Sequence, residues 1–160
     1  MATFTPAFHN ASHRVHGEHQ LLLNELTELN IALDELVCYS EVYADLAAAQ
    51  RVCRCGHHLA ELLPEHFVRE ESTVLATIAK VSPELREFAR EMVLQHQQLR
   101  RRLDSFSSAL ADLERAEDID AAVFRVKEEG KRLARELTDH IVLEENELDG
   151  FLPGAARQIE

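Results

Sequence analysis

The sequence predicts an all-α protein, an up-down-up-down antiparallel four-helix bundle. Three observations support this fold class. Apolar residues recur at alternating spacings of four and three along four long segments, capping and turn residues separate the segments, and a few histidines and glutamates interrupt the apolar stripes in register. A chain of 160 residues can bury a core but would make two undersized domains, so we expect residues 1–160 to form a single domain.

The composition and the charge narrow the class of protein. Leu, Ala, Glu and Arg dominate, with only five Gly and four Pro, as is typical of helical proteins. A net charge of −12 argues against partners such as nucleic acid or an anionic membrane, because both require a basic surface. No apolar run is long enough to span a membrane. The N-terminal sequence MATFTPAFHN lacks the charged segment followed by an apolar segment that is typical of a signal peptide. We therefore expect a cytoplasmic protein.

The first two helices follow from their apolar stripes. The first stripe begins at Phe8 and continues to Leu36. The second helix is predicted from near Glu41 to Lys80, with kinks or a local break at Gly56 and Pro64.

Capping residues place the third and fourth helices. The sequence VSPEL supplies Ser82 as an N-cap and Pro83 at the first helical position of the third helix. In the sequence AEDID, either Asp118 or Asp120 caps the fourth helix, which we expect to end within residues 150–153, where a glycine and a proline stand.

Six polar residues occupy positions that the apolar register would give to core residues. Burying unpaired carboxylates and imidazoles costs on the order of several kcal/mol each, so something must compensate them. A His and a Glu four residues apart differ by about 40° around a helix, so both can reach one ion. We therefore predict a metal site in the core of the bundle, the alternative being mutual His–Glu hydrogen bonding without metal. The six residues are His19, His66, Glu70, His96, His140 and Glu144.

The two halves of the chain repeat these features. HFVREE, starting at His66, matches HIVLEE, starting at His140, and HQLLLNEL, starting at His19, matches HQQLRRRL, starting at His96. The first two helices thus correspond to the last two, which predicts a pseudo-twofold site.

These motifs resemble the hemerythrin-like family, whose HHE cation-binding domain is a four-helix bundle around a non-heme di-iron centre. The resemblance covers nearly the whole chain and is carried by GEHQLLL, HFVREE, LQHQQL and HIVLEE together. It implies two iron ions as cofactors, the same six residues as ligands, and Glu70 and Glu144 as the residues that bridge the ions.

The chain also departs from the family pattern. Oxygen-carrying hemerythrins have a fifth histidine one turn before the one on the third helix, where this chain has Met92. Invertebrate-type members would select Glu145 as the last carboxylate, whereas the apolar register selects Glu144. His16 could supply the fifth histidine, but Val15 lies on the stripe instead, which favours a flanking role for His16.

Residues beside the predicted ligands remain open to two interpretations. An acidic or amide residue directly precedes each inward histidine, and it either orients an imidazole of a neighbouring helix or is an ordinary exposed helix residue. These residues are Glu18, Glu65, Gln95 and Asp139.

The three cysteines do not suggest a disulfide framework. Cys38, Cys53 and Cys55 are an odd number, and two of them are only two residues apart. The sequence CRCGHH could bind metal, but it lacks a second half, so we favour inert thiols.

The ligand chemistry suggests what the site does. Nitrogen and oxygen donors without thiolate suit iron, with zinc or manganese possible, and six donors over two ions leave positions open for an exogenous ligand. The favoured hypothesis is a non-heme di-iron protein whose partner is dioxygen or another small oxidant, which it binds or senses, or one that senses iron itself. The alternatives are a di-iron oxidase or peroxide-consuming enzyme, and a metal-responsive regulatory module that binds another divalent metal.

The enzyme alternative lacks one feature of ferritin-like oxidases. Those enzymes use Glu-x-x-His pairs, and no histidine of this chain has a glutamate three residues before it. A binding or sensing role is therefore preferred to an enzymatic one; no protein partner is predicted.

Overall fold

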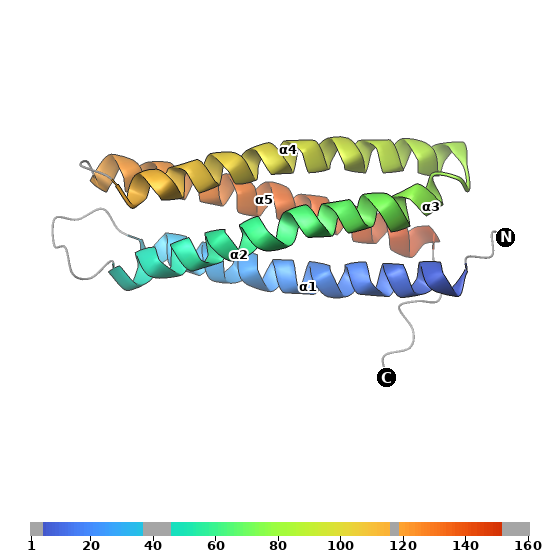
Figure 1. Ribbon diagram of the computed structural model, residues 1–160, viewed down its shortest axis with the longest axis horizontal. Helices are drawn as coiled ribbons and strands as arrows, with labels where there is room; N and C mark the ends of the chain where they lie inside the picture. Colours follow the sequence, from blue (N-terminus) through green and yellow to red (C-terminus); the bar gives the residue numbers. More distant parts are fainter. Residues whose placement is uncertain (1–4, 37–45, 116–118, 152–160) are drawn as a thin grey trace.

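The computed structural model describes residues 5–36, 46–115 and 119–151 of the chain. Four long antiparallel helices dominate it: α1 (Pro6–Glu35), α2 (Leu46–Glu70), α4 (Pro83–Leu113) and α5 (Ile119–Phe151). α1 packs against α2 and α5, and α4 packs against the same two helices (Figure 1). The predicted up-down-up-down bundle is confirmed, while a single domain over residues 1–160 stays a prediction.

The helix starts use the residues that capping chemistry favours. Thr5 Oγ1 accepts a hydrogen bond from the backbone N–H of Phe8 at 3.3 Å, and Pro6 follows it. Ser82 Oγ accepts from the N–H of Leu85 at 3.2 Å, which confirms the predicted N-cap of the third long helix. Each cap satisfies one of the free N–H groups at its helix start.

The second helix departs from its prediction. It runs without a break through Gly56 and Pro64, so of the predicted kinks or local break, the break is wrong and a kink stays a prediction. The irregularity comes later: the π-helix η1 (Glu71–Leu75) follows α2 directly and leads into the short α3 (Ala76–Ile78). Pro64 is exposed, so its ring faces solvent rather than the core. The predicted start near Glu41 lies outside the described residues.

Glycine serves packing in this bundle rather than helix breaking. A Cβ on Gly56 in α2 would overlap the Leu110 side chain of α4. A Cβ on Gly130 in α5 would lie 2.8 Å from Leu33 Cδ1 of α1. Glycine therefore lets neighbouring helices approach closely at both positions.

The fourth long helix starts and ends near its predicted limits. Ile119 is its first described residue, so Asp120 lies in the first turn rather than at the cap. Asp118 and Pro153 fall outside the described residues, and Gly150 is still helical.

Two apolar clusters fill the interior. The larger contains Leu22, Phe67 and Leu99, and the smaller, near the start of α1 and the end of α5, contains Val15 and Met92. The polar positions fall between them, as His19 does between Val15 and Leu22. Within the described residues, no helix is sufficiently long and apolar to cross a membrane.

Candidate metal centre

The structure brings all six predicted residues together between the two apolar clusters. Each is at most 2% exposed, and they are the buried polar or charged side chains of the described chain. α1 and α4 supply one histidine each, while α2 and α5 supply one histidine and one glutamate each. That they ligate metal stays a prediction. The six are His19, His66, Glu70, His96, His140 and Glu144.

The imidazoles form two matching pairs. The ring centroids of His19 and His66 lie 4.9 Å apart, and those of His96 and His140 lie 4.8 Å apart, both edge to face. Each pair forms, with Glu70, a group whose potential ligand atoms lie within 4.8 Å of one another. The pseudo-twofold arrangement inferred from the repeat is therefore present in the core.

Each carboxylate approaches one imidazole of each pair. Glu70 Oε2 lies 3.7 Å from His66 Nε2 and 3.1 Å from His96 Nε2. Glu144 Oε2 lies 3.5 Å from His19 Nε2 and 3.7 Å from His140 Nε2. The carboxylates thus connect the two pairs.

The outer nitrogen of every imidazole is held by an oxygen atom from a neighbouring helix. An ionised carboxylate can only accept, so these Nδ1 atoms carry the hydrogen and the Nε2 lone pairs face inward. The four hydrogen bonds are His19 Nδ1 to Glu145 at 3.1 Å, His66 Nδ1 to Glu18 at 3.1 Å, His96 Nδ1 to Glu71 at 2.9 Å and His140 Nδ1 to Gln95 at 3.0 Å.

These contacts resolve the two interpretations of the flanking residues. Glu18 and Gln95 do orient imidazoles of neighbouring helices. Glu65 and Asp139 do not hold these nitrogens and are exposed. Their place is taken by the second glutamate of each His-Φ-Val-x-Glu-Glu motif, Glu71 and Glu145.

This role of the second glutamate was not predicted, although a signal was present. Both motifs carry Glu-Glu, and the second residue lies about 100° further round the helix than the first, toward the next helix.

The remaining histidines lie outside the cluster. The His16 side chain is 59% exposed, and its Nδ1 lies 2.8 Å from Glu145 Oε1, which agrees with the flanking role. Met92, where a fifth histidine would stand, is fully buried. The other histidines, His9, His13, His57 and His58, are exposed.

Burial shifts the titration of the cluster toward its uncharged form. It lowers the pKa of His19 to about 2 and of His140 to about 3, and lowers the pKa of His66 and His96 in the same direction. Burial also raises the pKa of Glu70 to about 7, and burial together with the neighbouring Glu70 carboxyl raises the pKa of Glu144 well above its ordinary value. Neutral imidazoles with inward lone pairs are the form that binds metal.

The unpaired atoms test whether a cation fits this cluster. Within the described residues, Nε2 of His19 and His66 and both carboxylate oxygens of Glu70 and Glu144 are buried without a hydrogen-bond partner. The remaining two Nε2 atoms, of His96 and His140, face each other at 3.1 Å. Leaving such groups unpaired costs about 1–3 kcal/mol each. The described contacts give Nε2 of His19 and His66 no hydrogen-bond partner, whereas a cation accepts these lone pairs and those of the carboxylates, so the donor set fits.

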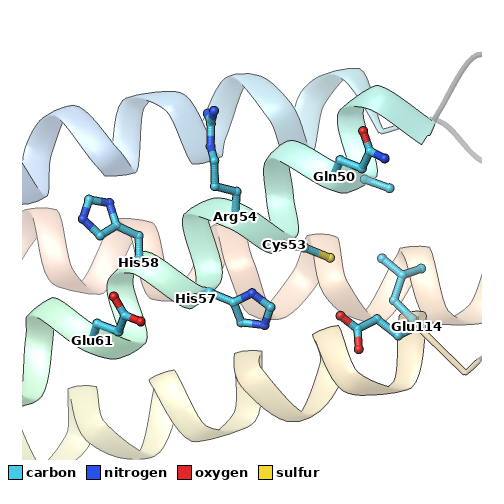
Figure 2. Close-up of a pocket in the computed structure, with 9 residues that line it drawn as sticks. Gln50, Cys53, Arg54, His57, His58, Glu61 and Glu114 are labelled. Carbon is cyan, nitrogen blue, oxygen red and sulfur yellow. The ribbon is translucent and has the colours of Figure 1, made fainter.

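The cysteines lie away from this cluster. Cys55 is buried in the larger apolar cluster, and Cys53 lines a pocket of about 730 Å³ between α2 and the end of α4, with His57 and Glu114 (Figure 2). Both thiols are free, and burial raises the pKa of each, to about 11 for Cys55. Neither belongs to the groups of potential ligands found among the described residues, and their inertness stays a prediction. Cys38 lies outside those residues.

A four-helix bundle whose core holds four imidazoles and two carboxylates with unpaired lone pairs is a cation-binding bundle. Residues 10–152 match the model of the Hemerythrin HHE cation binding domain. The chain therefore belongs to this family, which confirms the resemblance. Comparison with curated proteins gave no match, and comparison with solved structures gave none either.

Proposed function

We propose that the protein is a non-heme di-iron protein that binds or senses dioxygen, a related small oxidant or iron itself. The observation that carries this proposal is Glu70, which belongs to both groups of potential ligands. One ion would be held by His19 and His66 and the other by His96 and His140. Glu70 and Glu144 would bridge them.

The chain's own residues prepare the site for such a pair of ions. The Nδ1 hydrogen bonds hold the imidazoles in place with the lone pairs inward, and Phe67 stacks on the His96 ring at 4.2 Å between centroids. The apolar clusters on either side exclude water. Ferrous ions held in this way supply electrons and open coordination positions to a small oxidant. Zinc and manganese also suit the donor set.

A cytoplasmic setting belongs to the same proposal. Cys53 and Cys55 are free thiols, which persist in a reducing compartment.

A metal-responsive regulatory module is the second candidate. The buried, unpaired atoms of the core favour it, since a cation that satisfies them stabilises the folded bundle and couples its stability to metal supply. An oxidase or a peroxide-consuming enzyme has no comparable support.

Metal analysis combined with an optical spectrum tests the proposal. We expect two irons per chain and near-ultraviolet bands that change on addition of oxygen or azide. His66→Ala should lose iron and these bands, whereas His58→Ala, on the exposed face of the same helix, should keep both. Metal-free protein, or protein with one zinc and no optical response, would contradict the di-iron proposal.

A further inference from the structure

The hydrogen bonds behind the imidazoles differ in one place, although the two halves of the centre repeat each other. Three of the Nδ1 atoms are paired with carboxylates, and that of His140 is paired with the neutral amide of Gln95. Gln95 directly precedes His96 in α4, just as Glu18 directly precedes His19 in α1. The two halves therefore differ by one charge at equivalent positions.

The orientation of the Gln95 amide follows from its second contact. Gln95 Nε2 donates to Glu91 Oε1 at 3.2 Å, and a carboxylate oxygen can only accept. The amide oxygen therefore faces His140, whose Nδ1–H donates to it at 3.0 Å. His140 thus has the same inward lone pair as the other imidazoles, but a neutral acceptor behind it.

Positive groups contact one backing carboxylate in each half. Arg69 and Arg14 both contact Glu18 in one half, and Arg100 Nη2 lies 3.0 Å from Glu71 Oε1 in the other, so one backing carboxylate of each half is paired with guanidinium groups. Among the described residues, no guanidinium is paired with the acceptors behind His19 and His140, which are the Glu145 carboxylate and the Gln95 amide. The half formed by α1 and α2 therefore has a carboxylate behind both of its imidazoles, whereas the other half has a carboxylate behind one.

Solvent approaches the second half from outside. A groove of about 640 Å³ runs along α4 and α5, and both Gln95 and His140 line it. Glu18, at the equivalent position, is instead held by Arg69 and by Arg14, whose Nε lies 3.2 Å from Oε1.

We propose that the two ion positions are unequal, and that the ion held by His96 and His140 binds more weakly and leaves first. A carboxylate behind an imidazole makes it a stronger ligand, and loss of such a partner typically lowers metal affinity about 10–100-fold. Gln95 is thus a positioning residue that sets the weaker affinity of this half. The inference rests on the proposed two-ion centre.

Zinc release from the full chain tests the inequality. Protein loaded with two equivalents of Zn²⁺ is mixed with excess coloured chelator, and the histidine ring signals are followed by NMR. We expect two phases of one ion each, with the His96 and His140 signals changing in the fast phase. Gln95→Glu should slow that phase by about 10–100-fold, and Glu18→Gln should speed up the slow phase by a similar factor.

A control separates the hydrogen bond from general charge. Gln98 lines the same groove and is exposed, so Gln98→Glu adds the same charge there and should leave both phases unchanged. Equal release rates, a fast phase that belongs to His19 and His66, or no effect of Gln95→Glu would overturn the inference while two ions still bind. Binding of fewer than two ions would overturn the two-ion centre itself.

Discussion

At the scale of single residues, Glu70 belongs to both groups of potential ligands. Its Oε2 lies close to an imidazole of each pair, and it is fully buried. Its neighbour Glu71 hydrogen bonds the outer nitrogen of His96. The two adjacent glutamates therefore have different roles. Glu70 faces the predicted metal site, and Glu71 holds the imidazole of His96 through its outer nitrogen.

Glu70→Gln tests this division of roles. The amide keeps the shape of the side chain but removes the negative charge that both ions would share, so we expect fewer than two metal ions per chain by elemental analysis. Glu65→Gln makes the same change on an exposed side chain of the same helix, and this variant should bind as many metal ions as the unmodified protein. If the Glu70→Gln variant still bound two ions per chain, Glu70 would not be a ligand.

At the scale of helices, glycine positions are set by packing. The Cβ of Ala at position 130 would lie 2.8 Å from Leu33 Cδ1 and 3.0 Å from Phe106 Cε2, and both of these side chains are fully buried. Gly17 has nothing within 4 Å of a Cβ, and it lies exposed in α1.

The two glycines should therefore respond to alanine with opposite signs. We expect Gly130→Ala to lower the free energy of unfolding by about 1–3 kcal/mol through overpacking. Gly17→Ala should raise it by about 0.5–1 kcal/mol, because alanine favours the helix. Urea denaturation measures both, and a stabilising Gly130→Ala would show that α1 and α5 can separate without cost.

The elements also show what sequence alone could predict. The helices and the six core residues followed from periodicity, because a 3.6-residue repeat specifies which side chains face inward. Of the kinks or local break predicted at Gly56 and Pro64, the break was wrong. At Gly56 the close contact between α2 and α4 outweighs local propensity. The roles of Glu71 and Glu145 depend on which helix lies beside each of them. The spacing of apolar residues along one helix does not specify its neighbours.

At the scale of the whole molecule, the titration of the core ties stability to pH. Burial lowers the histidine pKa values from 6.5, to about 2 for His19, so their contribution to stability is full above pH 6.5 and lost as the pH falls. The pKa of Glu70, raised from 4.5 to about 7, acts in the opposite direction: its contribution is full below pH 4.5 and is lost as the pH rises from there through 7.

The metal-free protein should therefore be most stable near neutral pH. Four imidazoles outweigh two carboxyls on the acid side, so we expect the free energy of unfolding to fall from about pH 6.5 toward pH 5. On the alkaline side we expect it to fall as the pH rises from about 6.5 through 7, where folded Glu70 ionises. Urea denaturation of chelator-treated protein at a series of pH values measures this. A free energy that changed in one direction only would contradict the titration described for the core.

The position of the polar layer between two apolar clusters has a consequence for cooperativity. Without a cation, the layer adds unpaired groups where the larger cluster meets the smaller, so the end of the bundle that holds Val15 and Met92 is joined to the rest by its weakest section. We expect amide hydrogen exchange at that end to be fast in the metal-free protein and to slow to the rate of global unfolding once metal is bound. The centre would then act as the joint that makes two separately opening units fold as one.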